Sequence, residues 1–150
     1  MINHTELTAG KGRFKVTLFL QETGGHGLCC FLTGGERPHV GGTVLASLSE
    51  RVNGGGMTCN LWNIPLPGHK DSYLAEKLAK TLCLATNQPV AITAGLHVDN
   101  ASEEDIQLLV SNGCDTVAQY LQLIGKEGQV WKIILEKTEE SSSVSLVQAV

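Results

Sequence analysis

The sequence predicts an α+β fold, with a mainly antiparallel sheet of about five to six strands and two helices packed on one face. Four strand-like segments follow one another before the first helical pattern, which favours hairpins and antiparallel pairing. A helix, a strand and a second helix then follow. The chain has 150 residues, of which 42% are hydrophobic and 17% charged, as expected for one soluble globular domain.

The four early strands are predicted from their side-chain alternation and from the glycine-rich turns between them. Residues 13–21 alternate polar and apolar side chains, as a half-buried strand does. The glycine turn at 24–27 leads into a second strand over 28–33. A third strand over 39–49 and a fourth over 57–64 follow, again separated by glycines.

The helices are predicted from apolar residues that recur with helical spacing. The first stripe consists of Leu74, Ala75, Leu78, Ala79, Leu82 and Cys83, and Pro89 ends this helix. A fifth strand over 90–96 precedes the second helix, expected over 102–124. Ser102 and Asp105 form a capping pattern at its start. Gly113 costs about 1 kcal/mol relative to alanine inside a helix, so a break is possible there.

We divide the chain into three parts. Residues 1–12 are expected to form a flexible N-terminus, and residues 13–125 a single α+β domain that binds a cofactor. Residues 126–150 form a C-terminal extension of uncertain structure, in which 129–137 is a candidate further strand.

Composition argues against several classes of partner. A net charge of −4 without a basic run argues against nucleic acid. No apolar run reaches the roughly 18 to 20 residues that span a bilayer, and the N-terminus has no secretory apolar region. None of the pairs among the 5 cysteines has C-x-x-C spacing, which favours buried free thiols. We therefore expect a cytoplasmic protein.

Three histidines, His39, His69 and His97, share the same kind of surroundings. Each lies at a boundary between a loop and a regular element, with glycine nearby and a charged residue within three positions. Boundary residues of different strands can converge at one edge of a sheet, which makes a common site geometrically reasonable. His69 with Lys70 also begins a helix, where free N–H groups and a cation suit a phosphate.

The segments 34–41, 67–70 and 94–101, taken together, resemble the prenylated-flavin chaperone family. These are the small D-type proteins associated with gallate-decarboxylase-like enzymes of the UbiD class. The order and surroundings of the three histidines carry the resemblance, which covers roughly residues 13–124. It implies a non-catalytic homodimer that holds prenylated flavin mononucleotide (prenylated FMN, or FMN) near the subunit interface.

The resemblance further implies a fold like that of the small proteasome-assembly chaperones. It implies delivery of the cofactor to an apo UbiD-class decarboxylase, with a flavin prenyltransferase as a possible second partner. The cofactor-binding residues that it carries over are Glu36, Arg37, His39, Gly41, His69, Lys70, His97, Asp99 and Asn100.

Two other functions remain open at this stage. A metal-dependent enzyme would use His39, His69 and His97 as ligands, with Asp99 or Glu36 as base. A divalent metal bound by His69, His97 and Asp99 is a separate set that we consider. A protein-assembly module would use a surface and be indifferent to the histidines. No motif of a nucleophilic hydrolase, a zinc protease or a P-loop is present in the sequence.

Overall fold

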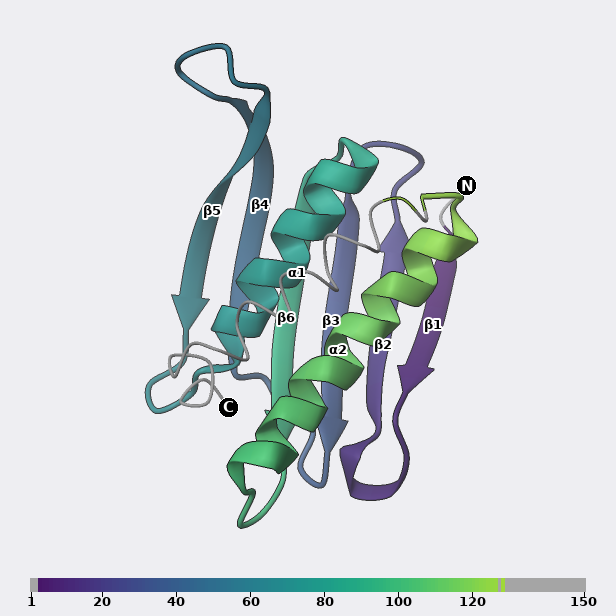
Figure 1. Ribbon diagram of the computed structural model, residues 1–150, viewed down its shortest axis with the longest axis vertical. Coiled ribbons are helices and arrows are strands. Elements are labelled where there is room, and N and C mark those ends of the chain that lie inside the picture. The colour runs from purple at the N-terminus through teal and green to yellow at the C-terminus, as the bar shows by residue number, and fades with distance from the viewer. Residues whose placement is uncertain (1–2, 127, 129–150) are drawn as a thin grey trace.

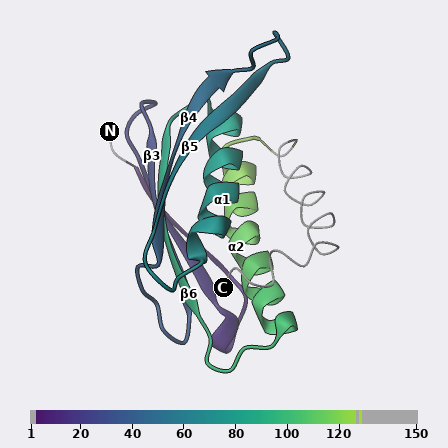
Figure 2. The ribbon, with the colours of Figure 1, turned by 90° about the vertical axis from the view of Figure 1, so that its left-hand side faces the viewer.

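The computed structural model describes residues 3–126 and 128, and has one six-stranded sheet with two α-helices. The strand order is β1-β2-β3-β6-β4-β5, as Figure 1 shows. Both helices cover the same face of the sheet, which Figure 2 shows edge-on. The predicted α+β class, the antiparallel majority and the helices on one face are all confirmed.

Strands β1 (His4–Ala9), β2 (Val16–Glu22) and β3 (Leu28–Gly35) form an antiparallel meander. A short 3-10 helix, η1 (Gly12–Phe14), connects β1 to β2, so the strand that we predicted over 13–21 begins three residues later, at Val16. The N-terminus expected to be flexible over 1–12 is instead largely the edge strand β1. The sequence of β1 gives no strand pattern, because Leu7 is its single strongly apolar residue and its single buried residue.

Strands β4 (Gly42–Glu50) and β5 (Met57–Pro65) form a hairpin at the edge of the sheet opposite β1. Strand β6 (Val90–His97) lies between the two halves, parallel to β3 and antiparallel to β4. Its register sets Gly35 of β3 opposite His97. The carboxyl ends of β3 and β6 therefore lie together at one edge, beside the beginning of β4.

Helix α1 (Asp71–Thr86) packs on β4, β5 and β6, and helix α2 (Glu103–Leu123) packs on β1 and β2. The core between helices and sheet is aliphatic, with Leu18, Leu32 and Leu78 fully buried. Burying one such leucine contributes about 1.5–3 kcal/mol. The predicted capping pattern of α2 is confirmed, since Ser102 and Asp105 each bond the other's backbone N–H.

Helix α2 continues unbroken through Gly113, contrary to the break we considered. A Cβ atom at this position would lie 3.1 Å from Leu74 Cδ2 and 3.4 Å from Leu32 Cδ2. The glycine thus lets α2 approach both α1 and the sheet closely, and the packing offsets its low helix propensity.

Strand β4, which we predicted over 39–49, begins at Gly42 rather than at 39. Residues 39–41 instead cross the end of β6, where the Gly41 N–H donates to the Ala94 carbonyl over 2.8 Å. This crossing carries His39 onto the sheet edge. The further strand that we considered over 129–137 lies outside the described residues.

Candidate functional site

The three similarly framed histidines meet at the edge where β3 and β6 end. The ring centroid of His39 lies 4.8 Å from that of His69 and 6.4 Å from that of His97. We call His39, His69 and His97 the histidine cluster. His39 comes from the crossing segment, His69 from the loop before α1, and His97 from the last position of β6.

Glycines allow the backbone around the histidine cluster to pack this closely. A Cβ atom on Gly95 would overlap the carbonyl oxygen of His39, and one on Gly35 would overlap that of His97. Gly41 leaves room in the same way for the carboxylate of Asp71. These glycines are therefore required by close approach at the site, and not only by turns.

Asp71, the first residue of α1, anchors two of the histidines. Its side chain is only 4% exposed. Oδ1 accepts the Leu96 N–H over 2.9 Å. Oδ2 lies 3.2 Å from His39 Nε2 and 3.6 Å from His69 Nδ1. The carboxylate thus fixes the end of β6 through one oxygen and faces the imidazoles with the other.

The hydrogen bonds of His39 determine its tautomer. Nδ1 lies 2.8 Å from the carbonyl oxygen of Arg37, and a carbonyl can only accept, so Nδ1 carries a proton. In the neutral imidazole, Nε2 then presents its lone pair to Asp71. A lone pair and a carboxylate oxygen at this distance need a cation between them, either a proton or a metal ion.

His97 has a different carboxylate partner, Asp99, two residues further along. Its Nε2 donates to Asp99 Oδ1 over 3.0 Å, and Arg37 binds Asp99 Oδ2 over 2.9 Å. These contacts, the His97 hydrogen bond first and the Arg37 charge second, lower the pKa of Asp99 below its usual range. Asp99 therefore stays ionised and holds His97 in one orientation.

Glu36 and Arg13 extend this network along the rim of the site. Glu36 Oε2 accepts the Asp99 N–H over 2.8 Å and lies 3.4 Å from Arg13 Nη2. Arg13 also donates to the Asp99 carbonyl over 2.6 Å. The segment that follows β3 is thus tied to the end of β6 by charged groups.

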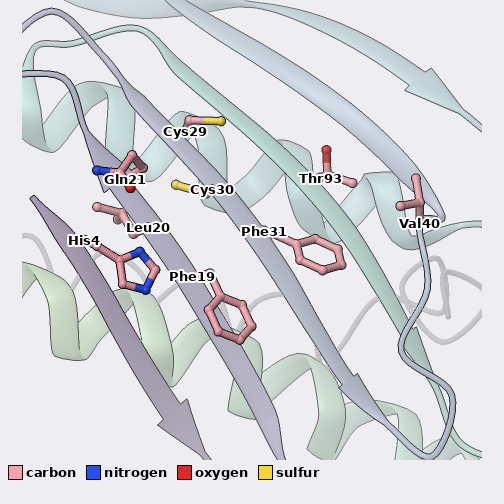
Figure 3. Close-up of a pocket in the computed structure, with 9 residues that line it drawn as sticks. All are labelled: His4, Phe19, Leu20, Gln21, Cys29, Cys30, Phe31, Val40 and Thr93. Carbon is pink, nitrogen blue, oxygen red and sulfur yellow. The ribbon is translucent and has the colours of Figure 1, made fainter. Parts of the chain in front are cut away.

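An apolar pocket lies on the open face of the sheet and reaches Val40, the neighbour of His39 (Figure 3). Its volume is about 440 Å³. Phe19 and Phe31 face each other across β2 and β3 with ring centroids 6.4 Å apart, and Thr93 of β6 lines the pocket between Phe31 and Val40. Its size falls in the range of about 300–1,000 Å³ typical of small-molecule sites.

A second pocket, of about 550 Å³, lies beside the start of α1. His69 and Lys70 line it together with Tyr73 and the loop before α1. The first N–H groups of α1 begin here, at the positive end of the helix dipole. This pocket therefore combines the features that suit an anionic group.

The structure brings most of the predicted site residues to this edge, but groups them differently. The metal set that we considered, His69, His97 and Asp99, does not form one cluster. Within the described part of the chain, the three side chains whose ligand atoms lie within 4.8 Å of one another are His39, His69 and Asp71. Asn100 adopts a positive φ of 52°, which suits an asparagine in the turn before α2.

Sequence reasoning missed Asp71, Arg13 and the Phe19–Phe31 pair. The signal for the phenylalanines was present, because strict alternation places both on the face opposite the buried leucines. In the sequence, Asp71 is indistinguishable from an ordinary acidic residue in the first turn of a helix. Arg13 reaches Asp99 across 86 positions of sequence, which no local pattern reveals.

Comparison with solved structures finds the same fold in a chaperone complex for yeast 20S proteasome assembly. The similarity covers 84% of this chain and 97% of that one, with a TM-score of 0.51 and 14% identity. This confirms the predicted likeness in fold. A search of the curated proteins finds no match. No helix in the described part of the chain has both the length and the apolar character needed to cross a membrane.

A family model, described as the prenylated flavin chaperone LpdD-like domain, matches residues 10–125. The match extends over most of the 150 residues and includes β2 to α2, the histidine cluster, the Asp99 network and every residue that lines the two pockets except His4. The chain therefore belongs to the prenylated flavin chaperone LpdD-like family.

Proposed function

We propose that this protein binds prenylated FMN without turning it over and delivers it to an apo UbiD-class decarboxylase. The observation that carries the proposal is an apolar pocket that includes Val40, the chain neighbour of His39 in the histidine cluster. A flavin has a flat apolar ring and an anionic phosphate, so it needs adjoining regions of these two kinds. Membership of the chaperone family supports the same reading.

The apolar pocket is assigned to the ring system. Phe19 and Phe31 offer aromatic surface on the sheet, and Val40 offers an aliphatic face beside His39. Aromatic rings favour offset stacking, worth about 0.5–1.5 kcal/mol beyond burial. Val40 is 54% exposed, so the pocket is open at this end and suits a ligand that must leave again.

The phosphate is assigned to the pocket beside α1. Lys70 supplies a positive charge, His69 a ring nitrogen, and the first turn of α1 its free N–H groups. Glu36, Arg37, His97, Asp99 and Asn100 line neither pocket and are assigned to further cofactor contacts at the sheet edge beside the histidine cluster. The prenylated flavin supplies the chemistry of decarboxylation in the partner enzyme, whereas this chain supplies binding, orientation and release.

We further propose a homodimer formed through the outer face of β4 and β5. Leu45 and Trp62 pair across these strands, and Ile64 extends the patch, with exposed fractions of 45%, 52% and 69%. The other outward positions there are Thr43, Ser47, Ser49, Thr58 and Asn60. An apolar patch without charges can face a copy of itself across a two-fold axis without like-charge repulsion.

A flavin prenyltransferase is the proposed source of the cofactor, and the cytoplasm the proposed location. Within the described residues none of the 5 cysteines forms a disulfide, which is compatible with a reducing compartment. A metal-dependent enzyme is the second candidate, because His39, His69 and Asp71 form a group that can hold a metal ion. It predicts turnover that a chelator abolishes.

Co-expression with a flavin prenyltransferase tests the proposal. The purified protein is expected to carry a flavin-type chromophore whose released mass is that of prenylated FMN, and to transfer it to an apo-decarboxylase. Phe31→Ala should weaken retention of the cofactor by removing a contact with its ring system. Lys70→Ala should weaken it by removing the positive charge beside its phosphate. His26→Ala, an exposed turn residue away from both pockets, is the matched control. A colourless wild-type protein that binds neither FMN nor prenylated FMN would refute the proposed function.

A further inference from the structure

We propose that His39, His69 and Asp71 form a binding site for one divalent transition-metal ion of the zinc class. The ligand atoms are His39 Nε2, His69 Nδ1 and Asp71 Oδ2, which lie within 4.8 Å of one another. Two imidazole nitrogens and one carboxylate oxygen are a donor set that Zn²⁺ and its neighbours accept.

The two distances from the Asp71 carboxylate to the histidines match those of a metal site. Two ligands at about 2.0–2.1 Å from a tetrahedral zinc ion are separated by roughly 3.3–3.4 Å. Asp71 Oδ2 lies 3.2 Å from His39 Nε2 and 3.6 Å from His69 Nδ1. The side chain of His69 is 42% exposed, so its ring is free to adjust toward a shared ion.

The protonation of His39 supports ligation by Nε2. Its Nδ1–H donates to the Arg37 carbonyl, which orients the ring so that Nε2 faces Asp71, with its lone pair toward the carboxylate in the neutral imidazole. Metal-binding histidines usually donate their other ring N–H to a carbonyl or carboxylate in this way. A metal ion between Nε2 and Oδ2 would turn two facing acceptors into two ligands.

The burial of Asp71 provides a second argument for a cation. A buried carboxylate is costly unless a positive charge or strong hydrogen bonds compensate it. Leu96 N–H satisfies Oδ1, while the ion-pair partners of Oδ2 are His39 and His69. Gly41 leaves the space that this carboxylate occupies, so the backbone is fitted to its position.

His97 lies outside this site despite its place in the histidine cluster. Its Nε2 donates to Asp99, and its ring is 6.4 Å from that of His39, centroid to centroid. His97 is therefore not a ligand of the proposed ion, because its carboxylate partner is Asp99 and not Asp71.

Three protein ligands leave a zinc-class ion with an open coordination position. His69 also lines the pocket that contains Lys70, so water or an anionic oxygen can reach the ion from there. A phosphate oxygen of the flavin is the ligand we assign to that position, and this part of the inference rests on the proposed function. The ion would offset the negative charge of Asp71 beside the phosphate.

Metal binding by the full chain tests the site directly. Protein stripped with a chelator is titrated with Zn²⁺ by calorimetry and with Co²⁺ by visible absorption, which reports the ligand geometry. We expect one ion per chain in the wild type. In His69→Gln and Asp71→Asn, affinity should fall at least roughly 10- to 100-fold, the loss that even outer-shell changes cause. His26→Gln, a change of an exposed turn histidine that lines neither pocket, should bind as the wild type does.

Asp71→Asn keeps the oxygen that accepts Leu96 N–H, and His69 is exposed, so both variants should retain the fold; circular dichroism checks this. Wild-type protein without stoichiometric binding, or ligand variants with unchanged affinity, would overturn the metal site. The proposed function is tested separately by the flavin chromophore of chelator-stripped protein. If the protein binds the metal but not the flavin, only the chaperone role is refuted. If it binds the flavin but not the metal, only the metal site is refuted.

Discussion

The backbone of His39 crosses directly over Gly95, so closely that a Cβ atom on Gly95 would overlap the His39 carbonyl oxygen. Neither backbone can yield easily, because Gly95 lies in β6 between β3 and the crossing segment. The same approach sets His39 against Asp71 and against the other two rings of the histidine cluster. One contact between a glycine and a histidine thus positions the centre of the site.

Gly95→Ala is therefore expected to destabilise the protein by about 3 kcal/mol, at the upper end of the cost of over-packing. It should also weaken ligand binding, because His39 must move. Chemical denaturation measures the first effect. Gly55→Ala is the control, since its Cβ would meet only the flexible Arg51 side chain, at 3.4 Å, and should change stability by less than about 0.5 kcal/mol. Equal effects of the two changes would contradict this account.

Asp99 should make the stability of the site depend on pH in the acidic range. Its pKa is lowered from 3.8 in the folded protein, by the His97 hydrogen bond first and the Arg37 charge second. A depressed carboxyl pKa contributes stability above the unfolded value, and the contribution is lost as pH falls through the folded pKa. The stability difference between wild type and Asp99→Asn should therefore shrink as the pH falls below about 4. A difference that stays constant from pH 7 to pH 2 would rule this out.

The adjacent thiols Cys29 and Cys30 should react very differently. Cys29 is exposed, whereas Cys30 is buried. Burial, and to a smaller extent electrostatic repulsion from Cys29, raises the pKa of Cys30 to about 12. Reactivity follows the thiolate, so iodoacetamide at pH 8 should label Cys29 and leave Cys30 unlabelled until the protein unfolds. Because the folded pKa exceeds the unfolded one, Cys30 contributes stability below about pH 9 that is lost as pH rises toward 12. Mass spectrometry of labelled peptides, with Cys29→Ser as control, checks the order.

The proposed dimer predicts that Trp62→Asp yields a folded monomer. A charge in the centre of an apolar two-fold interface meets its own copy, which disfavours association by several kcal/mol. Trp62 is 52% exposed in the single chain, so its loss should cost the monomer little. Sedimentation velocity measures the oligomeric state. Leu123→Asp, at an exposed position of α2 on the opposite layer, should leave it unchanged. A Trp62→Asp protein that sediments as the wild type does would place the interface elsewhere.

Local patterns sufficed for the elements that carry strong periodicity. The helical stripe from Leu74 to Cys83, the capping pair Ser102 and Asp105, and the break at Pro89 all appear as predicted. Strand β1 escaped prediction because an edge strand buries little, and a single buried leucine gives no pattern to detect. The unbroken helix at Gly113 escaped it because the compensation comes from Leu74 and Leu32, in other elements.

The sequence by itself determined the fold class and identified the three histidines, because periodicity and glycine context are local properties of the chain. Which carboxylate each histidine faces was decided only by the tertiary structure. The parallel register of β3 and β6 sets Gly35 opposite His97, and the crossing of residues 39–41 over Gly95 brings His39 to Asp71. These contacts join residues 32 or more positions apart, and they exist only when β-pairing and helix packing are complete.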